Sequence, residues 1–107
     1  FHGHPYLTGY AASKGAVAAF TYSLAWEYIK RGVRVNGVAP GSIETGISAQ
    51  TQAEMPTDAD WGLYDHLQAT NGFAAPDAIA SVIAMLASAD GYHLNGEIIR
   101  VDGGVHA

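Results

Sequence analysis

The chain has 107 residues, of which 49% are hydrophobic and 14% charged, a composition typical of one small globular domain and not of a disordered chain. Its formal net charge of −5, with only five Lys and Arg, argues against binding to nucleic acid or to an anionic membrane surface. The lack of cysteine excludes disulfides and thiol chemistry, no segment reads as a signal peptide or membrane span, and we expect a cytoplasmic protein.

The first third of the chain predicts a short extended lead-in followed by one long helix. Residues 1–8 contain the helix breakers Gly3 and Pro5, and a helical pattern then runs from Gly9 to Arg31 and stops at Gly32. Apolar or small residues occur on both sides of this helix, which predicts that both sides are buried. One face carries Tyr10, Lys14, Val17, Leu24 and Tyr28, and the opposite face carries Ala12, Ala16, Ala19, Ser23 and Trp26.

A strand and a long loop are predicted next. The run from Val33 to Ala39, closed by Pro40 and Gly41, is typical of a strand that ends in a turn. Residues 42–74 predict an irregular region with one or two short helices. Because connections this long are uncommon in compact domains, we expect a lid or a binding loop here.

The last third predicts a second helix and a second strand. Pro76 suits the first position of a helix, and Glu97 to Val101 indicates a strand that ends at residues 102–104. Two strands joined by a helix form a parallel βαβ unit. Because parallel sheets are covered on both faces and extended by neighbouring strands, the sequence predicts an incomplete doubly wound α/β domain. The apolar stripe of the helix consists of Ile79, Val82, Ile83 and Leu86.

Tyr10 and Lys14 are the candidate catalytic pair, because residues at i and i+4 project from the same side of a helix. Free tyrosine titrates near pH 10, too high for efficient proton transfer at neutral pH. An ammonium about 4 Å away, at an effective dielectric constant of about 20, favours the phenolate by about 4 kcal/mol. Such a pair could exchange a proton with a substrate oxygen. On spacing alone, however, a surface helix that carries both residues by chance is favoured.

The segments around the pair reverse that balance. In this order they are similar to the C-terminal part of short-chain dehydrogenase/reductases of the classical type, over nearly the whole chain and least between Ala49 and Phe73. Chance agreement at so many ordered places is very improbable. The segments are Tyr10 to Val17, Ser23 to Glu27, Gly32 to Asn36, Val38 to Gly41, Gly96-Glu97 and Arg100 to Gly104.

The resemblance implies an oxidoreductase that transfers a hydride between NAD or NADP and a small carbonyl or alcohol substrate. Tyr10 would be the acid/base for the substrate oxygen. Lys14 would hold the ribose hydroxyls of the nicotinamide nucleotide and assist Tyr10.

The resemblance also implies cofactor contacts after the first strand. Pro40 and Gly41 would bend the chain under the nicotinamide. The Ile43 backbone and the Thr45 hydroxyl would contact the carboxamide or the phosphates, in a Pro-Gly-x-x-x-Thr pattern that is weak by itself and fits an ordinary turn equally well.

Further parts of such a site have no counterpart in this sequence. These are the Gly-rich phosphate loop, the residue that selects NAD or NADP, and a catalytic Ser that would precede Tyr10. We therefore expect residues 1–107 to be the C-terminal part of a single NAD(P)-binding Rossmann domain that lacks its N-terminal half. Alone, they are expected to be inactive.

Two other functions stay open. The chain could be a catalytically inactive fragment that serves only in assembly, or an NAD-dependent epimerase/dehydratase-type member that shares the Tyr-x-x-x-Lys spacing. Arg34 to Asn36 and Arg100 to Gly104 look like the reductases instead, and enoyl-reductase-like members space the pair more widely. The resemblance also implies a homo-oligomer, either a dimer or a tetramer.

The histidines are weaker candidates. His2 and His4 alternate in the lead-in as two metal ligands could, but such histidines are more often polar surface. His66, His93 and His106 have no ligand-like spacing, so no metal site is expected.

Aromatic residues outside the motifs have two readings. Trp26, beside the small residues Ala19 and Ser23, fits the core or a subunit interface, and the resemblance favours the interface. In the long loop, lining of a substrate pocket and packing of the loop against the domain are equally good interpretations of Met55, Trp61, Tyr64 and Leu67.

Overall fold

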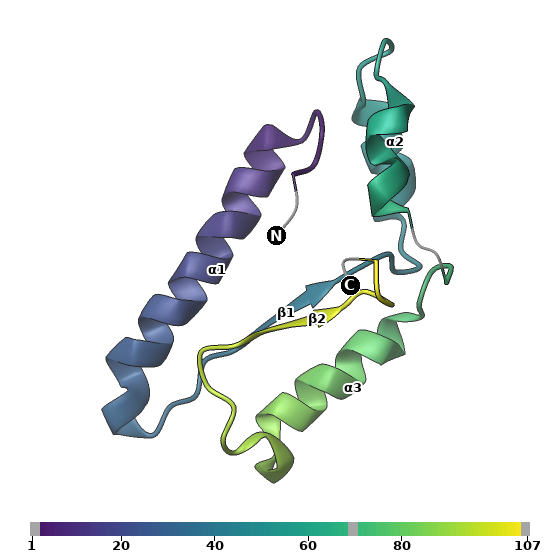
Figure 1. Cartoon of the computed structure of the whole chain (residues 1–107). Helices are drawn as coiled ribbons and strands as arrows, with labels where there is room; N and C mark the ends of the chain where they lie inside the picture. Colours follow the sequence, from purple (N-terminus) through teal and green to yellow (C-terminus); the bar gives the residue numbers. More distant parts are fainter. Residues whose placement is uncertain (1–2, 69–70, 106–107) are drawn as a thin grey trace.

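The computed structural model describes residues 3–68 and 71–105, apart from the side chains of residues 48 and 49. Its elements follow the predicted order, and two short helices lie in the 42–74 region, as expected (Figure 1). The elements are α1 (Thr8–Tyr28), η1 (Ile29–Arg31), β1 (Gly37–Pro40), α2 (Ile47–Glu54), η2 (Trp61–Leu67), α3 (Pro76–Ala87), η3 (Ala89–Gly91) and β2 (Ile98–Val101).

The strands β1 and β2 form a parallel pair, with Gly37 opposite Ile98 and Pro40 opposite Val101. Helix α3 lies between them in sequence and contacts β1. Figure 1 shows the pair running between α1 and α3, with α1 beginning at the end of the molecule where both strands end. The predicted parallel βαβ unit and the α/β class are therefore confirmed.

The first strand is shorter than the predicted Val33–Ala39, because a side chain takes the place of a neighbouring strand. The Val35 N–H donates to Oδ1 of Asn95 at 2.8 Å, and the Val35 carbonyl accepts from the N–H of Gly96 at 2.8 Å. These bonds satisfy the backbone of Val35 outside the ladder. The predicted start of the strand was wrong by four residues, since the ladder begins at Gly37.

The second strand also starts later than the predicted Glu97, at Ile98. The Asn36 amide donates to the Leu94 carbonyl at 2.9 Å, and its Oδ1 accepts from the Glu97 N–H at 3.0 Å. One side chain thus bonds two backbone groups of the turn that leads into β2. The paired region starts only where this side-chain bonding stops.

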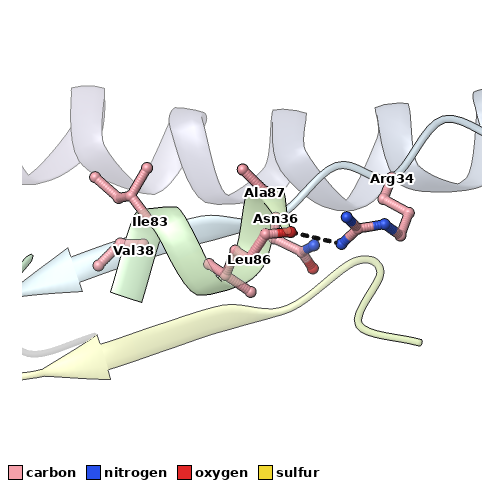
Figure 2. A pocket seen from close by; sticks show the side chains of 6 residues that line it. All are labelled: Arg34, Asn36, Val38, Ile83, Leu86 and Ala87. Atoms are coloured by element: carbon pink, nitrogen blue, oxygen red, sulfur yellow. Dashed lines mark hydrogen bonds between the residues drawn. The ribbon is translucent and has the colours of Figure 1, made fainter. Parts of the chain in front are cut away.

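Arg34 holds the C-terminal end of α3. Its Nη1 donates to the carbonyls of Leu86 and Gly91, both at 2.7 Å, and its Nη2 donates to Ser88 at 3.4 Å (Figure 2 draws the bond to Leu86). The last carbonyls of a helix have no partner within the helix, so a cation there satisfies them and complements the helix dipole. This half-buried guanidinium joins the segment before β1 to the helix that follows it.

Helix α1 ends as predicted but is buried differently. Gly32 terminates it after η1 with a φ of 70°, the left-handed conformation that glycine adopts most easily. Only the small residues Ala18, Thr21 and Ala25 are buried, whereas Trp26 is 78% exposed. The expectation that both sides of the helix are buried is therefore wrong in the described structure, since the predicted face of Ala12, Ala16, Ala19, Ser23 and Trp26 is exposed.

The core is correspondingly small. In the described residues, the buried hydrophobic side chains are Ala18, Ala25 and Leu86, and no large side chain is fully buried. Within the predicted stripe of α3, Leu86 is buried but Ile83 is 52% exposed. Burial of so little apolar surface contributes only a few kcal/mol to the free energy of folding. This contribution is too small to make a chain of this size fully stable.

We predict that Arg34→Ala destabilises the fold by about 2–3 kcal/mol, since the buried carbonyls at the end of α3 lose a charged donor. The measurement is denaturant unfolding of the intact polypeptide that carries these residues. Lys30→Ala, an exposed charge removal on η1, is the matched control and should change the free energy of unfolding by less than about 0.5 kcal/mol. Equal effects of the two variants would show that the bonds of Arg34 contribute nothing.

Candidate active site

Tyr10 and Lys14 lie one turn apart on α1 and touch. The Lys14 Nζ is 5.4 Å from the centroid of the Tyr10 ring, so the ammonium lies over the ring face. Tyr10 is 51% exposed and Lys14 is exposed, which leaves both polar groups accessible to a ligand. The predicted proximity of the two side chains is confirmed.

The lead-in contributes a third ring to this group. His4 packs edge-on against Tyr10, with ring centroids 6.0 Å apart and an interplanar angle of 80°. Edge-to-face pairs of this kind are favourable and fix ring orientation. The Tyr10 ring thus has two neighbours, the Lys14 ammonium over its face and the His4 imidazole edge-on.

The residues predicted to contact the cofactor follow β1 directly. The Gly41 N–H donates to the Val101 carbonyl at 3.0 Å and so extends the pairing by one bond. A Cβ on Gly41 would lie 2.6 Å from the Asp102 Cα, so only glycine fits without a shift of the backbone. Pro40 and Gly41 therefore turn the chain tightly over the end of β2.

Ile43 and Thr45 lie in the segment between this turn and α2. Ile43 pairs with Ala74 in an isolated parallel bridge, and the Ala74 N–H donates to the Ser42 carbonyl at 3.0 Å. This bridge fixes the backbone of Ile43, while Thr45 is exposed. Both residues lie at the carboxyl end of β1, the end at which open parallel α/β sheets bind ligands.

Sequence reasoning did not find the contact between the long loop and the lead-in. The Tyr64 hydroxyl of η2 donates to the Pro5 carbonyl at 2.5 Å, and the Asp60 N–H donates to the Tyr6 hydroxyl at 2.9 Å. These bonds join residues 54 and 59 positions apart, so no local pattern announces them. Of the two interpretations of Tyr64, the bond to Pro5 favours packing of the loop against the domain over lining of a substrate pocket.

Burial, and then the neighbouring Tyr6, raise the pKa of Tyr64 above its ordinary value of 10.0. The hydroxyl therefore keeps its proton at neutral pH and can donate. Because the folded-state pKa is the higher one, the bond to Pro5 is fully present below pH 10 and is lost only as the pH rises through that raised value.

The remaining candidates do not form a site. His2 and His106 lie outside the described residues, and within the described part of the chain no group of three or more metal-ligating side chains is found. In that same part, no helix is long and apolar enough to cross a membrane. Trp26 is exposed in this chain, so the reading of it as core is wrong here.

Two shallow depressions lie away from the predicted site residues. The first has a volume of about 250 Å³ and lies where α3 meets β1 and the segment before β1. It is lined by Arg34, Asn36, Val38, Ile83, Leu86 and Ala87 (Figure 2). The second, of about 350 Å³, lies on α1 and is lined by Tyr22, Ala25, Trp26, Ile29, Asn95 and Gly96. Neither depression includes Tyr10, Lys14 or the predicted cofactor-binding residues that follow β1.

Comparison with protein families gives one model that matches residues 2–106, described as "Enoyl-(Acyl carrier protein) reductase". Among curated proteins, the chain is 38% identical over 101 residues to 3beta-hydroxysteroid dehydrogenase 1 of Eggerthella lenta, covering 94% of this chain and 38% of that protein. It is 36% identical over 104 residues to 3-oxoacyl-[acyl-carrier-protein] reductase FabG of Thermotoga maritima, covering 97% and 40%. The chain therefore spans about two fifths of the length of these relatives.

Solved structures give the same result for the fold. A 4-hydroxyisoleucine dehydrogenase mutant complexed with NADH and succinate matches with a TM-score of 0.72 at 29% identity, covering 91% of this chain and 39% of that one. A blue fluorescent protein from a metagenomic library, in complex with NADPH, matches with a TM-score of 0.71 at 33% identity, covering 92% and 37%. The predicted fold, part of a doubly wound parallel-sheet (Rossmann) domain, is confirmed.

We predict that Gly41→Ala disrupts the turn after β1, at a cost of about 1–3 kcal/mol, because its methyl group would overlap the Asp102 backbone. Gly46→Ala is the matched control in the same segment, since a Cβ there meets nothing within 4 Å. The free energies of unfolding of both variants decide the matter. A Gly41→Ala variant as stable as Gly46→Ala would contradict the close approach.

Proposed function

The chain belongs to the short-chain dehydrogenase/reductase family, and we propose that it is the C-terminal part of an NAD(P)-dependent oxidoreductase that acts on a small carbonyl or alcohol substrate. The observation that carries the proposal is the contact of Tyr10 with Lys14 at the start of α1. Dehydrogenase and reductase names among the relatives favour this function over an epimerase or dehydratase. Those names differ in substrate, and the substrate of this protein stays open.

A nicotinamide nucleotide fits the residues at this end of the sheet. Lys14 would hold the ribose hydroxyls with its exposed ammonium, and Pro40 and Gly41 would support the nicotinamide from below. The backbone of Ile43, fixed by its bridge to Ala74, and the hydroxyl of exposed Thr45 would contact the carboxamide or the phosphates. When bound, the nucleotide supplies or accepts the hydride, and solved relatives with NADH and with NADPH leave both forms open.

Tyr10 would move the proton. In the reducing direction its hydroxyl gives a proton to the carbonyl oxygen of the substrate, and in the oxidising direction its phenolate takes one from the alcohol. The Lys14 ammonium lies over the face of the Tyr10 ring, and His4 packs against the ring edge-on. A positioned acid/base of this kind typically contributes about 10²–10⁴-fold to the rate.

The second hypothesis is that this chain is a fragment with no catalytic turnover of its own. The exposure of large apolar side chains on α1 supports it. Trp26, Phe20 and Ile29 on α1 are at least half exposed, and the sheet has two strands in the described part of the chain. Exposed apolar surfaces of this kind are usually buried against another part of the protein or a partner. Here, a further segment of the same domain or a second copy in a homo-oligomer would bury them. The two readings are compatible if the intact polypeptide is the active enzyme.

We predict that Tyr10→Phe in the intact polypeptide lowers kcat by about 10²–10⁴-fold and leaves nucleotide affinity nearly unchanged, because only the proton-transferring group is removed. Lys14→Ala should lower both kcat and nucleotide affinity. The measurements are oxidation of NADH and NADPH with a panel of ketones, together with nucleotide titration by fluorescence.

Tyr92→Phe is the matched control, because Tyr92 is 76% exposed and lies beyond α3. It should behave like the unaltered protein. If Tyr10→Phe kept a normal kcat, Tyr10 would not be the acid/base.

We also predict that residues 1–107, expressed alone, show no nicotinamide-dependent reductase activity and either associate or stay unfolded. In the described part of the chain the core is small and the sheet consists of β1 and β2, so another chain could extend this sheet at its edges. Sedimentation, circular dichroism and the same ketone assay test this. A folded monomer with steady turnover is the opposite outcome and would show that the chain is sufficient.

A further inference from the structure

The lead-in just before Tyr10 contacts the candidate acid/base and the long loop at the same time. His4 packs on the Tyr10 ring, the Pro5 carbonyl accepts from Tyr64, and the Tyr6 hydroxyl accepts from the Asp60 N–H. Three consecutive residues therefore connect the segment 47–67, which contains α2 and η2, to the ring that we propose transfers the proton.

The backbone of Tyr6, in the lead-in, has an unusual conformation. Its φ is 61°, and it is the one non-glycine residue in the described part of the chain with a positive φ. Bulky side chains rarely adopt this left-handed conformation, and such outliers persist where surrounding contacts impose them. The contacts found here are the bonds that the lead-in makes to Asp60 and Tyr64, together with the turn closed by the Leu7 N–H and the His4 carbonyl at 3.2 Å.

Tyr64 contacts both the lead-in and other residues of the long loop. Its hydroxyl lies 3.6 Å from Sδ of Met55, the residue that follows α2, and it donates to the Pro5 carbonyl. Its ring lies 5.6 Å from that of Trp61, measured between centroids. The end of α2, the body of η2 and the lead-in thus meet at one half-buried side chain.

We propose that Tyr64 is a positioning residue that, together with Tyr6, seats segment 47–67 beside Tyr10 and thereby sets the binding of the substrate. This role rests on the proposed function, since it assigns to the segment a wall of the site where Tyr10 acts. We name the two bonds, Tyr64 to Pro5 and Asp60 to Tyr6, the latch. The latch acts on where the substrate lies, whereas the proton transfer itself belongs to Tyr10.

The test compares Tyr64→Phe and Tyr6→Phe with the unaltered intact polypeptide. Each variant keeps the ring and removes one hydroxyl, and therefore one bond of the latch. The loss of one neutral hydrogen bond corresponds to a change of about two- to tenfold in a local opening equilibrium. We expect hydrogen exchange of the 55–67 backbone to accelerate by that factor in each variant. The KM for the carbonyl substrate should rise severalfold, while kcat stays within about twofold, because Tyr10 and Lys14 are untouched.

Tyr92→Phe is again the control and should change neither the exchange of residues 55–67 nor KM. Unchanged exchange in both latch variants would overturn the latch. Faster exchange with an unchanged KM would overturn its role in substrate binding. If the unaltered protein shows no NAD(P)-dependent turnover, the proposed function fails, and the exchange measurement still judges the latch independently.

Discussion

The fold depends on how the chain enters its two strands. Each strand pairs over only four residues, too few to hold a parallel pair in register by ladder bonds alone. The segments before the strands supply the rest. The Asn95 side chain accepts from the Val35 N–H, and the Asn36 side chain bonds the backbone of Leu94 and Glu97. Arg34 ties the same region to the end of α3. With these bonds at one end of the pair, the opposite ends, where the strands finish, are free to carry the site.

The geometry of the site follows from that anchoring. Since both strands finish together, the turn at Gly41 packs on Asp102, and Asn71 reaches the Gly103 carbonyl at 3.0 Å. Helix α1 starts at this same end of the strand pair (Figure 1), the end at which open parallel sheets bind ligands, and Tyr10 belongs to its first turn. The fixed parts of the candidate site are thus backbone segments at strand ends, and the proposed catalytic side chains belong to one helical turn.

Most of this arrangement was readable from the sequence. The helix, the parallel pair and the Tyr10–Lys14 contact follow from residue spacing, because i to i+4 geometry and βαβ connectivity are local rules. The strand starts were wrong because the decisive partners, the side chains of Asn36 and Asn95, lie about 60 residues away from the groups that they bond. The bond from Tyr64 to Pro5 was missed for the same reason, since nothing near either residue marks the other as its partner.

Screening by water decides what the Tyr10–Lys14 pair can do. The attraction between two unit charges a few ångströms apart is about fourfold stronger at an effective dielectric constant of about 20 than in bulk water. Tyr10 is 51% exposed in this chain, so water surrounds the proposed pair. The proposed proton transfer would therefore gain from any cover that excludes water from Tyr10, whereas the bonds of Tyr64 and Tyr6 are proposed to act on substrate binding.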